Sequence, residues 1–416
     1  MSSVPGNIVI VGGGVGAVAA AEALRNEGFD GNVTLISDEV SLPYDRPPLS
    51  KGYLSGEMSM GDILLHSLEW YAENRITLTL GQAVTSIDVA GNAVVVANAE
   101  RVAYDRLLLA NGARARLLPG IPAELSSRVH YVRTTQDADR IRTQAIGGIN
   151  GGKRAVMIGG GVIGIETAAT LKQLGCDVTV LEMMPRVMAR FFPAELSQML
   201  ATIHADKGVK ILTNIGIESI KAAGEGAVVT LKDGNEIPAD LLVVGIGVIP
   251  NAELGSDAGL KTQLGGIEVN GFGQTSSPNI YAIGDVAAFP LPDSSITRWE
   301  NWTHAWQFAN VVVKHMLGKE VAPYAETPWI WSDQYDFNIQ VTGSSEAQQI
   351  VLRGSLEAGR LTAFHLQQGR VAGATTINDS RNKASVKKLI EKNALVPTDQ
   401  LSDTSVDLKK LAAALG

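Results

Sequence analysis

Hydrophobic and polar positions follow the same order twice along the chain. Residues 7–37 read NIVIVGGGVGAVAAAEALRNEGFDGNVTLIS, and residues 154–182 read RAVMIGGGVIGIETAATLKQLGCDVTVLE. Each copy begins with a β-branched apolar run, continues through a triple glycine and an alanine-rich stretch, and ends in a second apolar run. This pattern predicts a strand, a helix and a second strand in each copy. A late glycine, Gly28 or Gly175, closes each predicted helix.

Both copies carry the glycine fingerprint of a dinucleotide-binding turn. The first glycine permits a tight turn, the second lets the backbone approach a pyrophosphate, and the third small residue lets helix and strand pack closely. The pyrophosphate would accept hydrogen bonds from N–H groups at the helix N-terminus. Two copies in this context predict two bound dinucleotides; ordinary glycine-rich turns are the alternative. The fingerprint positions are Gly12, Gly14 and Ala17 in the first copy and Gly159, Gly161 and Gly164 in the second.

An acidic residue after the second strand of such a unit binds the ribose. Glu182 directly follows the second apolar run, where its carboxylate can accept hydrogen bonds from the ribose of NAD and repel the 2′-phosphate of NADP. Two methionines follow it in place of an arginine, so NADH is favoured over NADPH. In the first copy the strand ends at Ser37, and Asp38 or Glu39 is expected to serve. A solvated turn carboxylate is the alternative there.

Composition limits the classes of function. The chain has 416 residues, a formal net charge of −8 and 44 glycines. The length favours two or three domains, each with its own core. The glycines exceed the usual share without any collagen-like period, so we expect many of them where a ligand approaches the backbone. The negative charge argues against a general affinity for nucleic acid.

Membrane segments are not expected. The longest apolar runs, residues 8–21 and 241–249, are shorter than the roughly 20 residues of a spanning helix. The first basic residue, Arg25, comes after the first apolar run, unlike the order in a signal peptide. We therefore expect a cytoplasmic protein without a membrane partner.

Five further motifs follow in order along the chain. They are residues 42–51 (LPYDRPPLSK), 109–112 (LANG), 244–251 (VGIGVIPN), 280–285 (IYAIGD) and 328–334 (PWIWSDQ). Together with the fingerprints, they resemble the FAD- and NADH-dependent ferredoxin reductases of bacterial Rieske oxygenase and cytochrome P450 systems. Asn111 stands where this family usually has threonine, which leaves the local hydrogen bonding open.

The resemblance implies an α/β fold of the glutathione reductase type, with two Rossmann-like dinucleotide-binding domains and a C-terminal α+β domain. We expect an FAD-binding domain of residues 1–113 and 245–321, an NAD-binding domain of residues 114–244, and a C-terminal domain of residues 322–416. The implied enzyme is an oxidoreductase with FAD and NADH as cofactors and no metal. It passes single electrons to a [2Fe–2S] ferredoxin and so serves an oxygenase, as in aromatic hydrocarbon catabolism.

The resemblance assigns Lys51 and Glu166 to catalysis. In the family, the corresponding lysine and glutamate face each other beside the reactive edge of the flavin. Glu166 is expected on the first turn of the NAD-binding helix, two residues beyond Gly164. A cation there would stabilise reduced flavin, and the carboxylate would compensate a partly buried ammonium. A structural ion pair that links two domains is the alternative.

Further residues are assigned to the cofactors by the same resemblance. Asp285 would accept a hydrogen bond from the ribityl chain of FAD, and a turn-forming Gly-Asp is the alternative. Trp302 aligns with a residue near the flavin ring, just before a predicted helix over residues 303–317. The remaining FAD positions are Gly16, Arg46, Val84, Ala110, Gly112, Arg133 and Gly284, and the remaining NAD positions are Ile163, Gly245, Ile246 and Gly247.

The single cysteine separates this interpretation from related flavoenzymes. One cysteine excludes an intramolecular disulfide, a C-x-x-C pair and a thiolate metal site. Cys176 follows Gly175 at the end of the second predicted helix, which favours a buried hydrophobe over a redox centre. Two alternatives stay open: an NADH-dependent flavin oxidase or reductase with a small acceptor, and a flavin-bearing, redox-responsive interaction protein.

The C-terminal part has its own pattern. Strand-like segments occupy residues 338–343 and 361–367, and residues 385–391 look helical. Because ferredoxins are usually acidic, a basic cluster here could steer docking. A solvated helix face is the alternative. The cluster consists of Arg381, Lys383, Lys387 and Lys388.

Overall fold

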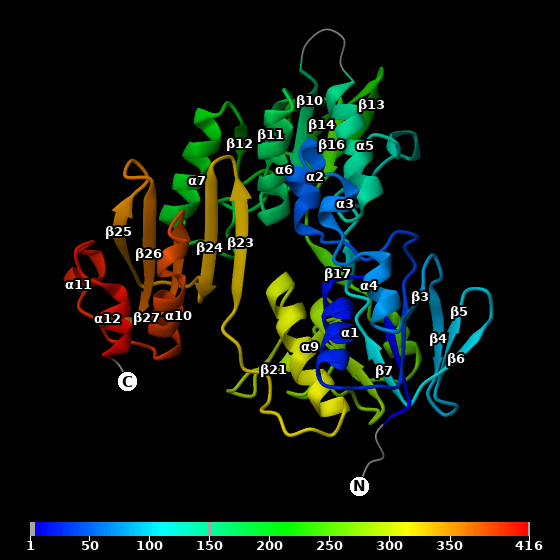
Figure 1. The fold of residues 1–416 in the computed structure, drawn as a ribbon. Helices are drawn as coiled ribbons and strands as arrows, with labels where there is room; N and C mark the ends of the chain where they lie inside the picture. Colours follow the sequence, from blue (N-terminus) through cyan, green and yellow to red (C-terminus); the bar gives the residue numbers. More distant parts are fainter. Residues whose placement is uncertain (1–4, 148–151, 415–416) are drawn as a thin grey trace. The chain divides into compact units, whose positions relative to one another are not determined.

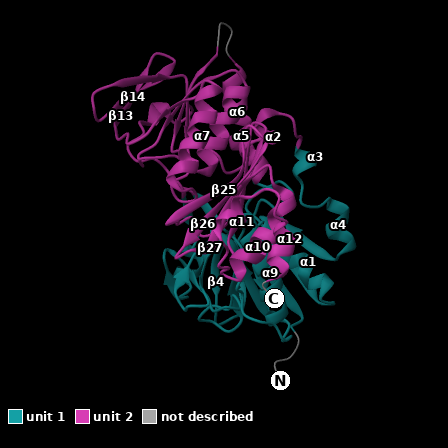
Figure 2. Ribbon diagram, turned by 90° about the vertical axis from the view of Figure 1, so that its left-hand side faces the viewer, with its two compact units in different colours: residues 1–46, 60–114, 248–326 teal, residues 47–59, 115–247, 327–416 magenta. Residues whose placement is uncertain are grey.

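The computed structural model describes residues 5–147 and 152–414, which divide into two compact units (Figures 1 and 2). The first unit comprises residues 5–46, 60–114 and 248–326, and the second comprises residues 47–59, 115–147, 152–247 and 327–414. A short segment, residues 47–59, thus joins the second unit although the chain on both sides of it builds the first. The three domain boundaries drawn from the sequence stay a prediction.

A parallel five-stranded sheet, in the order β20-β7-β1-β2-β3, forms the centre of the first unit. Its strands are β1 (Asn7–Val11), β2 (Asn32–Ile36), β3 (Ile76–Thr79), β7 (Arg106–Leu109) and β20 (Ile280–Ala282). Helix α1 (Val15–Asn26) connects β1 to β2 and packs against α9 (Trp302–Met316). Because helices cover this sheet, its inner strands are nearly continuous apolar runs.

Smaller elements complete the first unit. An antiparallel sheet is formed by β4 (Val84–Asp88), β5 (Ala93–Val96) and β6 (Arg101–Ala103). A four-stranded sheet is formed by β18 (Thr262–Gln263), β19 (Gly266–Glu268), β21 (Ala287–Pro290) and β22 (Ile296–Thr297). The other elements are α3 (Met60–Ile63), α4 (Leu68–Glu73), α8 (Glu253–Asp257), the 3-10 turn η3 (Gly284–Val286), β17 (Val248–Pro250) and, at the unit boundary, β8 (Ala113–Ala115).

The second unit contains a parallel sheet of the same kind, in the order β12-β11-β10-β16-β9. Its strands are β9 (Val129–Tyr131), β10 (Arg154–Ile158), β11 (Asp177–Leu181), β12 (Lys210–Leu212) and β16 (Leu241–Val244). Its helices are α5 (Thr135–Ile146), α6 (Val162–Gln173) and α7 (Ala194–Asp206). An antiparallel sheet of β13 (Ile217–Ala223), β14 (Gly226–Leu231) and β15 (Glu236–Ala239) accompanies it. Short helices are η1 (Pro47–Ser50), α2 (Gly52–Ser55) and η2 (Ala123–Leu125), of which η1 and η2 are 3-10 helices.

The C-terminal part of the second unit is an antiparallel sheet in the order β23-β24-β27-β26-β25. The strands are β23 (Trp329–Gln334), β24 (Phe337–Gly343), β25 (Gln349–Ser355), β26 (Arg360–Gln367) and β27 (Arg370–Ile377). Three helices pack on it around a common apolar core (Figure 1). They are α10 (Lys383–Glu391), α11 (Thr398–Ser402) and α12 (Leu408–Ala413), preceded by η4 (Ser380–Asn382).

The structure confirms the main elements predicted from the pattern. Both strand–helix–strand repeats form, as β1-α1-β2 and β10-α6-β11. Gly28 and Gly175 follow the helix ends with φ of +76° and +89°, a conformation that favours glycine. The helix predicted over residues 303–317 is α9, and the helix predicted over residues 385–391 lies within α10.

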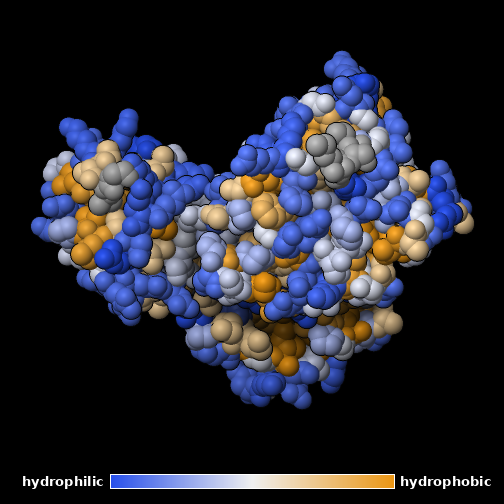
Figure 3. Space-filling model, turned by 90° about the horizontal axis from the view of Figure 1, so that it is seen from below, coloured by the Kyte–Doolittle hydropathy of each residue, from blue (hydrophilic) through white to orange (hydrophobic). Residues whose placement is uncertain are grey.

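Within the described residues, no helix is long and apolar enough to cross a membrane. Hydrophilic residues cover most of the face drawn in Figure 3, with hydrophobic ones among them. The cytoplasmic location stays a prediction.

Candidate functional site

The first fingerprint forms the turn between β1 and α1. Gly12 has φ of +130°, and a Cβ atom there would lie 2.3 Å from the carbonyl oxygen of Ala110, so the fold itself requires glycine. Gly14 has an extended backbone that any residue adopts, and an added Cβ would meet no atom within 4 Å. Protein packing therefore does not explain glycine at Gly14, whereas close approach of a ligand does. Ala17 is completely buried.

The second fingerprint repeats this geometry between β10 and α6. Gly159 has φ of +104°, and its Cβ would lie 2.4 Å from the carbonyl oxygen of Gly245. Gly164 could not carry a Cβ either, since it would lie 2.0 Å from the carbonyl oxygen of Gly159. Gly161 again has an extended backbone and open space around the added Cβ. Gly14 and Gly161 are thus equivalent positions of the two turns, and at both of them only an approaching ligand requires glycine.

Both turns can bind an anion. Gly14 and Gly161 are the N-cap residues of α1 and α6, and neither provides a side-chain hydrogen bond to the first turn. A glycine N-cap therefore leaves the first N–H groups and the positive end of the helix dipole to an external acceptor. Two 12-residue helices with this cap fit two pyrophosphates.

The residues after β7 and β16 lie beside these turns. Ala110 and Gly245 are the neighbours that force glycine at the two turns, and Gly112 and Gly247 have φ of +61° and +101°. Ile246 lies between Gly245 and Gly247 and is partly exposed. These predicted cofactor residues therefore gather at the carboxyl ends of the parallel strands, where nucleotides bind in open α/β sheets.

Asn111, the departure from the family pattern, forms a reciprocal pair with Asn251. The Nδ2 atom of Asn111 donates to the carbonyl oxygen of Asn251 at 2.7 Å, and the Nδ2 atom of Asn251 donates to the carbonyl oxygen of Asn111 at 2.8 Å. The Oδ1 atom of Asn111 is buried and has no hydrogen-bond partner among the described residues. A buried acceptor in this condition fits a site that a ligand donor completes.

Glu182 is held by the second turn. Its Oε2 atom accepts from the N–H of Gly160 at 2.5 Å, and its Oε1 atom accepts from the N–H of Met184 at 2.6 Å. A carboxylate has further lone pairs, so these bonds orient Glu182 and still leave acceptor sites for a ribose. In the first unit, Ser37 takes the place beside the glycine turn that Glu182 has in the second unit. A Cβ atom added to Gly13 would lie 2.6 Å from the Oγ atom of Ser37.

The acidic residues that follow Ser37 differ in their surroundings. Glu39 binds the guanidinium of Arg46 at 2.6 Å and accepts a hydrogen bond from the hydroxyl of Tyr44 at 2.5 Å. Burial acts to lower the pKa of Arg46, but the charge and hydrogen bond of Glu39, together with Tyr44 and Asp285, outweigh it and raise that pKa. Asp38 is exposed, and its assignment to a ribose stays a prediction.

Other predicted FAD residues lie in the first unit. Trp302 begins α9 and donates from Nε1 to Oδ1 of Asp45 at 2.7 Å. Gly284 has φ of +69° and precedes Asp285 in η3. Gly16 has a packing role, because a Cβ there would lie 3.3 Å from Cδ1 of Ile283.

Lys51 and Glu166 form an ion pair, both within the second unit. The Nζ atom of Lys51 lies 3.3 Å from Oε1 of Glu166, and the side chains are 16% and 2% exposed. Because α6 begins at Val162, Glu166 is its fifth residue and starts the second turn, so its predicted place on the first turn was wrong. The Nζ atom also lies 3.4 Å from Oδ2 of Asp333 and 5.5 Å from the ring centre of Trp331.

Two serines complete the surroundings of Glu166. Ser50 donates from Oγ to Oε2 at 2.5 Å, and Ser332 donates from Oγ to Oε1 at 2.6 Å. Burial raises the pKa of Glu166, while the charge of Lys51 and the two hydroxyls act against this rise. Sequence reasoning missed Ser50 and Ser332, although both stand inside quoted motifs, directly beside Lys51 and Asp333.

Three predicted positions lie elsewhere on the units. Val84 is a partly exposed residue of β4 in the first unit. Arg133 precedes α5 in the second unit, and its backbone N–H donates to the carboxylate of Asp137. Ile163, the second residue of α6, is 40% exposed. Their cofactor roles stay predictions.

Cys176 is a buried hydrophobe, as predicted. It is 1% exposed and directly precedes β11, and its Sγ lies 3.9 Å from the carbonyl oxygen of Ala145. Burial raises the pKa of the thiol to about 11, so a thiolate is disfavoured at neutral pH. No group of three metal-binding side chains occurs among residues 5–147 and 152–414.

The positive charge of the basic cluster around α10 is partly compensated by neighbouring carboxylates. Arg381 pairs with Asp379 at 3.5 Å, and Lys387 pairs with Glu391 at 3.5 Å. The Nζ atom of Lys383 lies 3.4 Å from the ring centre of Trp329, a cation–π contact.

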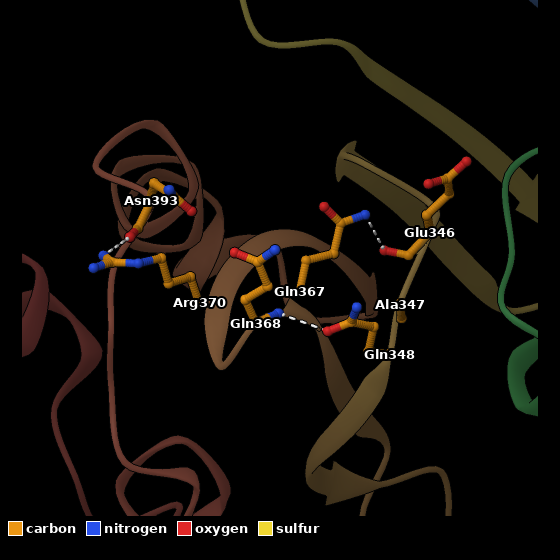
Figure 4. A pocket seen from close by; sticks show the side chains of 7 residues that line it. All are labelled: Glu346, Ala347, Gln348, Gln367, Gln368, Arg370 and Asn393. Atoms are coloured by element: carbon orange, nitrogen blue, oxygen red, sulfur yellow. Dashed lines mark hydrogen bonds between the residues drawn. The ribbon is translucent and has the colours of Figure 1, made fainter.

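A polar pocket of about 460 Å³ lies at the turns of the C-terminal sheet (Figure 4). The amide of Gln367 and the guanidinium of Arg370 donate to backbone carbonyls of the pocket, and the amide oxygen of Gln348 accepts from a backbone N–H. None of the lining residues is among the predicted site residues. The lining residues are Glu346, Ala347, Gln348, Gln367, Gln368, Arg370 and Asn393.

Known proteins share this architecture over the whole chain. The chain is 38% identical to rhodocoxin reductase of Rhodococcus erythropolis over 406 residues, which cover 97% of this chain and 93% of that protein. It is 37% identical to the ferredoxin–NAD(+) reductase component of the anthranilate 1,2-dioxygenase system of Burkholderia cepacia, with 96% and 98% covered. The reductase in a covalent putidaredoxin reductase–putidaredoxin complex superimposes with a TM-score of 0.91 at 36% identity, with 98% of both chains covered.

Two family models match the chain in succession. Residues 329–412 match the model described as Reductase C-terminal, which corresponds to the antiparallel sheet β23–β27 and the helices after it. Residues 6–309 match the model that includes both phosphate-binding turns. The chain therefore belongs to the pyridine nucleotide-disulphide oxidoreductase family.

Proposed function

We propose that this protein is the ferredoxin reductase component of a multicomponent oxygenase system. It takes a hydride from NADH onto FAD and passes single electrons to a [2Fe–2S] ferredoxin. The observation that carries the proposal is the matched pair of turns at Gly14 and Gly161, where only a ligand explains glycine. The relative at 37% identity that is named as the ferredoxin–NAD(+) reductase component of a dioxygenase system supports this partner.

The cofactors supply the redox chemistry when bound, and the protein binds and orients them. We assign FAD to the first unit, which contains the turn of Gly12 and Gly14, Asp285 in η3, and the buried Oδ1 of Asn111 that has no hydrogen-bond partner among the described residues. We assign NADH to the second unit, where Gly161 and the oriented carboxylate of Glu182 are available.

Lys51 is proposed as the cation that stabilises reduced flavin. The carboxylates of Glu166 and Asp333 lie 3.3 and 3.4 Å from its ammonium, so opposite charge is supplied beside a side chain that is only 16% exposed. Replacing Lys51 with Met should slow flavin reduction by NADH in stopped-flow measurements. An unchanged rate would leave Lys51 with only a structural role.

The lone cysteine supports direct electron release. Disulfide chemistry needs two thiols, and Cys176 is buried with a raised pKa. The acceptor is therefore proposed to be a one-electron partner instead of a disulfide substrate.

One assay tests the proposed function. Purified protein with NADH should reduce cytochrome c rapidly only when a [2Fe–2S] ferredoxin is added. Rapid reduction without ferredoxin would indicate a flavin reductase or oxidase that uses small acceptors. Slow flavin reduction under every condition would indicate a redox-responsive interaction protein.

A further inference from the structure

A buried chain of polar side chains leads from α7 through β23 to Glu166 on α6. The Nε2 atom of His204 lies 2.8 Å from Oε1 of Gln334, and the Nε2 atom of Gln334 donates to Oγ of Ser332 at 2.8 Å. Ser332 in turn donates to Oε1 of Glu166 at 2.6 Å. All four side chains are at most 2% exposed, and all belong to the second unit.

The hydrogen bonds of this chain all point in one direction. Because the amide nitrogen of Gln334 donates to Ser332, its oxygen must face His204 and accept. The ring proton of His204 is therefore on Nε2. Its Nδ1 is buried and has no hydrogen-bond partner among the described residues, so it is a bare acceptor, which costs less than a buried N–H. Aligned donors reinforce one another, and here they end on a carboxylate.

The charged and titratable groups around the chain are few. Glu166 faces Lys51, which lies between η1 and α2. Lys51 also faces Asp333 on β23. His204 packs against the ring of Tyr335 at 5.2 Å, and the Nζ atom of Lys207 lies 5.6 Å from that ring centre. Burial raises the pKa of Glu166 and lowers that of His204. The donors that end on Glu166 oppose the first of these shifts.

We propose that His204, Gln334 and Ser332 are positioning residues that keep Glu166 ionised, and that Glu166 thereby holds the ammonium of Lys51 in place. The stabilisation of reduced flavin by Lys51 rests on the proposed function, whereas the charge state of Glu166 does not depend on it. His204 is 130 residues from Gln334 in the sequence and stands in none of the quoted motifs, yet it supplies the first donor.

Infrared difference spectroscopy on the full-length, flavin-loaded protein tests the charge state. The wild type should show no protonated-carboxyl band from Glu166 at neutral pH. His204→Leu should gain such a band, and the double variant His204→Leu, Glu166→Gln should lose it again. His204→Gln should restore the wild-type spectrum, because its amide N–H can donate to Gln334. Ser332→Ala removes the last donor with little change in volume and should give the same band if His204→Leu folds poorly.

His365→Leu is the matched control. His365 is also completely buried in the second unit and bonds Ser344 and Thr375, and no hydrogen bond among the described residues joins it to Glu166. It should lose stability without gaining the band. A band in the wild type, no band in His204→Leu and Ser332→Ala, or an equal band in His365→Leu would each overturn the proposal.

Flavin reduction by NADH gives a second readout. In His204→Leu the rate should fall as pH decreases, by about tenfold per pH unit below the new pKa, and should recover at high pH. A uniform loss at every pH would overturn the charge role and indicate a packing role for His204. If NADH reduced no flavin in the wild type, the proposed function would fail, whereas the infrared result would still decide the state of Glu166.

Discussion

Single residues set the nucleotide preference proposed for the second unit. Glu182 is oriented by the N–H groups of Gly160 and Met184, so its charge lies at a fixed place beside the phosphate-binding turn. A fixed carboxylate discriminates against a 2′-phosphate by repulsion, which a neutral amide of the same shape does not provide.

Glu182→Gln should therefore reduce the preference for NADH over NADPH. We expect the ratio of the two kcat/KM values to fall roughly tenfold, which corresponds to about 1.4 kcal/mol of differential binding. Steady-state kinetics with both nucleotides measure this ratio. An unchanged ratio would show that Glu182 does not face the ribose.

At the scale of elements, the turn and helix of the second repeat contain two glycines that are required for different reasons, one for ligand binding and one for packing. Gly161 leaves open space for a ligand, whereas Gly164 lies against the carbonyl oxygen of Gly159. Gly161→Ala should leave the thermal midpoint unchanged and weaken NADH binding severalfold. Gly164→Ala should lower the midpoint, because its Cβ would lie 2.0 Å from that oxygen. Thermal unfolding and NADH titration of both variants separate the two roles, and equal NADH affinity in Gly161→Ala would contradict the assignment.

The basic cluster at helix α10, predicted to attract ferredoxin, can be tested by charge reversal. Lys387 is paired with Glu391, so Lys388 is the better probe of an attractive surface. Lys388→Glu should raise the apparent KM for ferredoxin severalfold at low salt, and the difference should shrink at high salt. Asp399→Lys on α11 is a charge control expected to have a smaller effect. Equal KM values at low salt would place the docking surface elsewhere.

The sequence predicts the elements whose pattern is local. The two strand–helix–strand repeats, α9 and α10 follow from glycine spacing and apolar periodicity. Local patterns did not predict that residues 47–59 belong to the second unit, nor that two serines bond Glu166. These features depend on pairs more than 100 residues apart, such as Ser50 with Glu166 and His204 with Gln334, for which a single sequence has no period or spacing.

The whole molecule carries buried histidines that should make it sensitive to acid. His304 is 1% exposed, packs on Phe289 at 4.6 Å, and burial lowers its pKa to about 3. The unfolded chain takes up this proton near pH 6.5 and the folded chain only near pH 3, so the free energy of unfolding falls as pH decreases through this window.

His304→Phe should therefore flatten the pH dependence of stability between pH 6.5 and 3. If the unfolded protein binds one proton more than the folded protein, the free energy of unfolding changes by about 1.4 kcal/mol per pH unit. Thermal midpoints of both proteins, measured across the window, give the comparison. Parallel curves would mean that His304 takes up its proton at the same pH in the folded and the unfolded protein.

The central claim is that electrons leave the flavin one at a time to a ferredoxin. The most direct measurement mixes the protein anaerobically with limiting NADH and excess oxidised [2Fe–2S] ferredoxin, and counts reduced clusters by electron paramagnetic resonance. We predict two reduced ferredoxins for each NADH consumed. Clusters that stay oxidised under the same anaerobic conditions, while NADH is consumed and the flavin is reduced, would contradict the claim.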